Sequence, residues 1–252
     1  MIRTFVLALF YIFLATAILF LSHYNYLPIA LALAMLPAAG SWWRHGRSVQ
    51  ALVPAVPKIV FGVSVATLIG LNQQPTGQPI FPLASQATLA AFYAGWLTWL
   101  HVAKSSPDKQ LMVAAVNQFF IISAIFLAAA FWHWPGLAVV VASWFGSYLV
   151  AYWLLSERSD QNAGIFAVIW ALVVAEMAWV FNSWLVNYVI AGGYAIVPQA
   201  ALIIMGLGYC FASVYQAHQA RSLSKRRLVE YILIGVIMLA IVVAGTRWSG
   251  TV

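Results

Sequence analysis

Residues 163–187 read AGIFAVIWALVVAEMAWVFNSWLVN, and this stretch decides the fold. Its 25 residues hold one ionisable side chain, Glu176, near the middle. A helix of about 20 apolar residues, rising ~1.5 Å each, crosses a hydrocarbon core of ~30 Å. The stretch therefore predicts a transmembrane helix that carries a carboxyl group at depth, where its insertion costs about 2.5 kcal/mol or more.

The whole chain has the same character. It has 252 residues, of which 64% are hydrophobic and 7% charged, whereas a soluble domain carries about 25% charge. We therefore expect an all-α, polytopic helical bundle in which residues 1–252 form a single transmembrane domain. The formal net charge of +7 raises the question of a nucleic-acid partner. The charges flank apolar segments, as orienting charges do, so we expect a lipid bilayer and no nucleic acid.

The apolar segments predict nine transmembrane helices. The N-terminal segment imitates a secretory signal, but its apolar run continues through Leu21, so we expect it to be retained as the first helix. The second segment carries Pro28 and Pro37, which predicts a kinked or only partly spanning helix. The predicted helices are residues 4–22, 27–43, 55–72, 81–103, 111–132, 136–155, 163–188, 194–215 and 228–246.

The basic residues test this count independently. With nine helices, eleven of the 12 Lys and Arg residues fall on one side of the membrane, and only Arg247 falls on the other. Positive charge marks cytoplasmic loops, so the N-terminus is predicted to be cytoplasmic and the C-terminus outside.

A weak internal repeat is present. Residues 91–96 align with residues 143–148 at an offset of 52, and residues 208–212 echo both. Each copy has two small residues four positions apart, a spacing that lets helices approach closely in lipid. The pattern favours a bundle built from repeated helical hairpins.

Glu176 is the main functional candidate. On a helix it shares a face with Trp179, Ser183 and Asn187 toward the outer end. A face of this kind is typical of the wall of a cavity that opens to the outside. Two interpretations remain open: a proton-relay or cation-binding carboxylate, or a neutral side chain that hydrogen-bonds a neighbouring helix.

Two further polar pairs lie inside predicted helices. Asn117 and Gln118 would complement Glu176 if their two helices are neighbours, although a packing role is the simpler interpretation. Pro198 and Gln199 fall in the eighth predicted helix, where proline frees a backbone carbonyl that either builds a site or marks a kink.

A basic run is the candidate contact for anionic lipid headgroups on the cytoplasmic side. Its members are Arg221, Lys225, Arg226 and Arg227. The five histidines have no metal-binding spacing, and no phosphate loop, paired catalytic carboxylates or nucleophile elbow is present. We therefore expect no cofactor or metal, and the sequence leans away from an enzyme.

The motifs Glu176-x-x-Trp179 and Thr246-Arg247-Trp248 make the last 80 or so residues similar to a family of small polytopic bacterial membrane proteins with no assigned activity. The resemblance implies a multi-pass protein of the bacterial inner (plasma) membrane and nothing about mechanism.

Three classes of function remain. The sequence favours a transporter or channel for a small solute, ion or proton, with Glu176 as the coupling group. The alternative is a non-catalytic subunit or scaffold that packs against a second copy or a partner membrane protein. A lipid-modifying enzyme is the least favoured, because catalysis needs convergent polar groups that the sequence does not offer.

Overall fold

The computed structural model describes residues 2–23, 26–44, 50–71, 83–103, 106–157, 162–183, 187–190, 195–219 and 224–245. These residues form a helical bundle with one small β-hairpin. The helices are α1 (Ile2–His23), α2 (Leu27–Ala34), α3 (Leu36–Arg44), the 3-10 helix η1 (Gln50–Ala55), α4 (Val56–Gly70), α5 (Leu83–Val102), α6 (Pro107–Trp132), α7 (Gly136–Ser156), α8 (Ala163–Ser183), α9 (Gln199–Gln219) and α10 (Lys225–Gly245).

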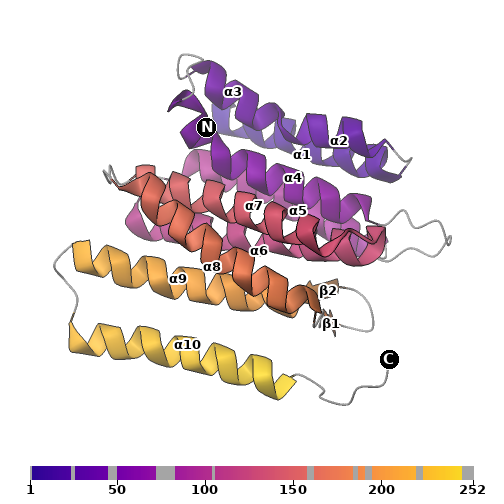
Figure 1. The fold of residues 1–252 in the computed structure, drawn as a ribbon. Coiled ribbons are helices and arrows are strands. Elements are labelled where there is room, and N and C mark those ends of the chain that lie inside the picture. Colours follow the sequence, from indigo (N-terminus) through magenta and orange to yellow (C-terminus); the bar gives the residue numbers. More distant parts are fainter. Residues whose placement is uncertain are drawn as a thin grey trace.

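The long helices lie side by side in layers (Figure 1). Helices α1, α2 and α3 form one edge, α4 to α7 the centre, and α8, α9 and α10 follow toward the opposite edge. Helix α6 is the central element, because it packs against α4, α7 and α9. In its most apolar stretch 72% of the residues are buried, against 22% in α8. Helix α8, which carries Glu176, is therefore peripheral in the bundle.

The second predicted segment is broken into two helices. Helix α2 ends at Ala34 and α3 begins at Leu36, just before Pro37. The amides of Ala38 and Ala39 both bond to the carbonyl of Met35, so the Ala34 carbonyl loses its usual i+4 donor. The Tyr93 hydroxyl of α5 donates to that carbonyl at 3.2 Å. The proline therefore breaks the helix, and a neighbouring helix supplies the missing hydrogen bond.

Aromatic rings fill the centre between α4, α5 and α6. Phe61 is fully buried, and its ring centroid lies 5.0 Å from that of Phe120 and 5.9 Å from that of Tyr93. Such offset and edge-on contacts suit the ring quadrupoles. This cluster ties the three central helices together.

Two predicted helices are shorter than expected, because a hairpin lies between them. Strand β1 (Asn187–Ile190) pairs antiparallel with β2 (Ala195–Pro198), with Tyr188 opposite Val197. The prediction that Asn187 continues the face of Glu176 is therefore wrong, since α8 ends at Ser183. The prediction that Pro198 interrupts a helix is also wrong, since it ends β2 and α9 begins after it. The β-branched and aromatic residues around the turn favour strands, and proline suits the position before a helix.

The predicted helical bundle is confirmed at the level of its architecture. Within the described residues six helices are long and apolar enough to cross a membrane: Thr4–Ser22, Leu52–Gly70, Pro107–Trp132, Gly136–Ser156, Ala163–Ser183 and Gln199–Gln219. The segment Leu27–Trp43 is apolar but shorter. Large apolar side chains such as Phe13 and Leu137 are exposed on the surface of the bundle, which is compatible with a membrane protein.

The predicted repeat does not extend to packing. Ser143 and Ser147 are fully buried. Their predicted equivalents Ala91 and Gly95 are exposed, and a Cβ at Gly95 would have no neighbour within 4 Å. The repeat predicts matching packing at these pairs, and this is wrong, because the small residues serve a close helix contact in α7 but line an exposed groove in α5.

Candidate functional site

Helix α8 has two different faces. Its buried residues are Ala163, Ala167, Ala171, Val174, Ala175 and Ala178. These small side chains recur every three or four positions, so they form a stripe that packs closely along α7. Glu176 lies on the opposite, exposed side of the helix.

Glu176 sits about two-thirds of the way along α8 from its N-terminus. Its neighbours Leu172 and Trp179 are 52% and 61% exposed. Among the described residues no side chain makes a hydrogen bond or ion pair with the Glu176 carboxyl group. Ser183 is also exposed, and its hydroxyl donates to the Trp179 carbonyl at 3.5 Å. The face of Glu176 therefore points away from the bundle, and it does not line either of the hollows described below.

Asn117 and Gln118 are buried in the central helix α6, away from Glu176. The Asn117 amide donates to the carbonyl of Val113 in its own helix at 2.8 Å. The Gln118 amide donates to the hydroxyl of Ser147 in α7 at 2.8 Å. The geometry supports the packing interpretation of Gln118, because its bond joins two helices and does not reach α8.

Pro198 and Gln199 lie at the base of the hairpin. Both are buried, and the Gln199 amide lies 3.3 Å from the Tyr188 hydroxyl, to which it donates. The side chain thus links the first turn of α9 to strand β1. This contact fixes the hairpin on the end of the helix.

The predicted lipid-contact residues cluster where α10 begins. Lys225 and Arg226 lie in the first turn of α10 and are exposed. The backbone of Arg227 continues this turn, whereas Arg221 lies outside the described residues. The arrangement puts at least two cations next to the end of α9, since α9 and α10 pack against each other.

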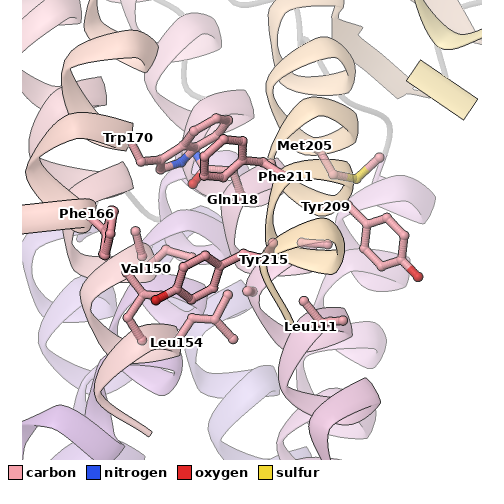
Figure 2. A pocket seen from close by; sticks show the side chains of 16 residues that line it. Leu111, Gln118, Val150, Leu154, Phe166, Trp170, Met205, Tyr209, Phe211 and Tyr215 are labelled. Carbon is pink, nitrogen blue, oxygen red and sulfur yellow. The ribbon is translucent and has the colours of Figure 1, made fainter. Parts of the chain in front are cut away.

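Two hollows stand out among those that open between the described helices. One is a shallow groove of about 870 Å³ between α1 and α5, lined largely by alanines such as Ala8, Ala87 and Ala91. The other is a more enclosed cavity of about 100 Å³ bounded by α6, α7, α8 and α9 (Figure 2). We call the second the four-helix cavity. Its lining is apolar except for Gln118 and the tyrosine hydroxyls, and it includes Leu111, Val150, Leu154, Phe166, Trp170, Gly208 and Tyr215.

Aromatic rings separate α8 from α9 and so keep the four-helix cavity open. Trp170 stacks on Phe211 with 6.0 Å between ring centroids, and Phe166 contacts Tyr215 at 5.5 Å. Gly208 leaves room for the Trp170 ring, since a Cβ there would lie 3.0 Å from it. The sequence pattern does not predict this site, although the small pair Gly208 and Ala212 was its signal. These residues line a space and do not bring two backbones together.

The four-helix cavity lies toward one end of the bundle. Its walls use the start of α6 at Leu111, the end of α7 at Leu155, the start of α8 at Phe166 and the end of α9 at Tyr215. This is the end at which Lys225 begins α10. Tyr215 accepts a hydrogen bond from the Gln219 amide at 2.9 Å, so polar groups follow the apolar lining toward this end.

Comparisons with protein-family models, with curated proteins and with solved structures give no match to this chain.

Proposed function

We propose that this chain is a multi-pass protein of the bacterial inner membrane that works as a non-catalytic scaffold, and that it assembles through the outer face of α8. The observation that carries this proposal is the position of Glu176, exposed on a helix face whose other side is already packed against α7. The one-sided basic residues and the apolar surface support membrane insertion with a cytoplasmic N-terminus.

An exposed carboxyl group in hydrocarbon needs a partner. Leaving it against lipid costs about 2.5 kcal/mol or more, whereas an interhelical hydrogen bond recovers about 0.6–2 kcal/mol and a second helix shields the group. Glu176 has no partner among the described residues of its own chain. A helix from another molecule is therefore the natural source of one.

The occupant that we propose is a second copy of this chain. In a two-fold dimer the same patch meets itself, so Glu176 of one copy faces Glu176 of the other. A protonated carboxyl group both donates and accepts, so two such groups satisfy each other without a cation. Leu172 and Trp179, both exposed beside Glu176, would then pack across the same axis.

Cross-linking tests this assembly. In a Cys210→Ser background, single cysteines at Val173 and Val180, both exposed on α8, should cross-link in native membranes. A cysteine at Phe13, 74% exposed on α1, should not. Glu176→Leu should reduce the α8 cross-link about 5- to 30-fold, the equivalent of 1–2 kcal/mol, and Glu176→Gln should retain it because an amide also donates and accepts. An α8 cross-link that Glu176→Leu leaves unchanged would contradict the proposal. Cross-linking of α8 only to a different protein, and not to a second copy of this chain, would also contradict it.

Transport is the second candidate, and Glu176 itself favours it as the ionisable residue near the middle of a predicted span. Against it, the groove between α1 and α5 and the four-helix cavity are lined by other, mostly apolar side chains. Glu176→Gln again separates the two functions. It removes titration and would abolish proton-linked flux in proteoliposomes, but it preserves the assembly expected of a scaffold.

A further inference from the structure

We propose that the four-helix cavity is a binding site for one acyl chain of an anionic phospholipid, whose headgroup lies at the start of α10. The inference depends on the membrane insertion proposed above, but not on assembly through α8. It assigns a ligand class to a cavity that Glu176 does not line.

The chemistry of the lining selects a hydrocarbon chain. The residues facing the space are leucine, valine, alanine, methionine and aromatic side chains, and Gln118 already uses its amide nitrogen on Ser147. An apolar space of this kind stays dry and accepts apolar ligands. The space free of protein atoms, counting the open mouth, is about 750 Å³, so a chain segment can enter from the side.

The position of the mouth selects a lipid as the source of that chain. Phe211 and Tyr209 of α9 line the cavity and are 62% and 40% exposed, so the lining of the cavity continues onto the lateral surface of the bundle. In a membrane this surface meets lipid tails and not water. Figure 2 shows the Phe211 ring against Trp170, with Tyr215 reaching from α9 toward Phe166.

The charge at the end of the cavity selects an anionic headgroup. The polar pair Tyr215 and Gln219 ends α9, and Lys225 and Arg226 are exposed in the first turn of α10. Cations at this level attract anionic lipid by about fivefold in affinity for each charge. The cavity and the start of α10 lie at the same end of the bundle. One phospholipid would therefore place its acyl chain beside Trp170 and its phosphate beside Lys225.

Tryptophan quenching tests the site. The protein is reconstituted in vesicles that contain phosphatidylglycerol or phosphatidylcholine with brominated acyl chains, and the signal of Trp170 is the difference between wild type and Trp170→Phe. We expect stronger quenching of Trp170 by the brominated phosphatidylglycerol. Lys225→Gln with Arg226→Gln should remove this preference. Phe13 is 74% exposed on α1, away from the face proposed for assembly, so the tryptophan in Phe13→Trp should be quenched by both lipids and reports insertion separately.

A second test fills the cavity and compares the result with a matched substitution outside it. Ala115→Leu with Ala151→Leu places bulk inside the lining and should abolish the Trp170 signal, whereas Ala84→Leu on the exposed face of α5 should leave it intact. If the filled variant does not fold, retention of phosphatidylglycerol by wild type in native mass spectrometry, lost in Lys225→Gln with Arg226→Gln, supports the site. Equal quenching of Trp170 by the two lipids, or quenching unchanged in a folded filled variant, would overturn it. An unquenched tryptophan in Phe13→Trp would instead contradict membrane insertion.

Discussion

Gly62 shows how one residue sets the distance between two helices. It lies in α4 beside the break between α2 and α3, where a Cβ would fall 2.5 Å from the Ala34 carbonyl oxygen and 3.2 Å from its carbon. Both atoms belong to the backbone, so neither moves at low cost. The same carbonyl receives the Tyr93 hydroxyl, and a shift of α2 would also weaken that bond.

Gly62→Ala should therefore lower the free energy of unfolding by about 1–3 kcal/mol, the usual cost of overpacking. Gly95→Ala in α5 is the control, because its Cβ would meet nothing within 4 Å and alanine favours a helix over glycine by up to about 1 kcal/mol. Thermal unfolding of the purified protein in detergent measures both. Equal stability of the two variants would mean that α2 shifts away from the added methyl group without lowering the free energy of unfolding.

Helix pairing explains what the sequence predicted well and what it missed. Long apolar runs predicted α6, α7 and α8 to within a few residues, because apolar length decides such helices. The hairpin was missed, because residues 187–198 are as apolar as a helix end. The direction of Glu176 was also missed, since helical spacing gives the face that it shares but not which face packs. The alanine stripe of α8 was the available signal for the packed side.

The pairing of α6 with α7 yields a quantitative prediction. Gln118 and Ser147 share a buried hydrogen bond, and Ile121 of α6 fills the space over Gly146 of α7. In a double-mutant cycle, Gln118→Leu and Ser147→Ala should show a coupling of about 0.6–1.7 kcal/mol. Gln118→Leu with Thr88→Ala is the control and should be additive, because the Thr88 hydroxyl bonds within α5. Additive effects in both pairs would remove the interhelical role of Gln118.

At the scale of the whole molecule, the charges and the fold favour one orientation for the membrane insertion proposed above. The basic residues gather at one end of the predicted helices, and that end holds Lys109, whose ammonium group donates to the carbonyls of Leu100 and Ala103 at 3.1 and 2.6 Å. Lys109, in the first turn of α6, thus caps carbonyl groups at the C-terminal end of α5. The four-helix cavity lies toward the same end, where α10 starts. An orientation with this end in the cytoplasm places cations, cavity and anionic lipid together.

Single-cysteine labelling tests this orientation in a Cys210→Ser background. A cysteine at Thr76, in a charge-free loop outside the described residues, should react with a membrane-impermeant maleimide added to intact cells. A cysteine at Ser105, beside the basic end of α5, should react only after the cells are opened. Ser105 is chosen over Ser106 because the Ser106 hydroxyl accepts the Lys109 amide at 3.1 Å and caps α6, and loss of such a cap costs about 1 kcal/mol. Labelling of both positions from the same side would mean that α5 does not cross the membrane. If both react in intact cells, the loops after α5 exchange sides, and the basic start of α10 lies outside.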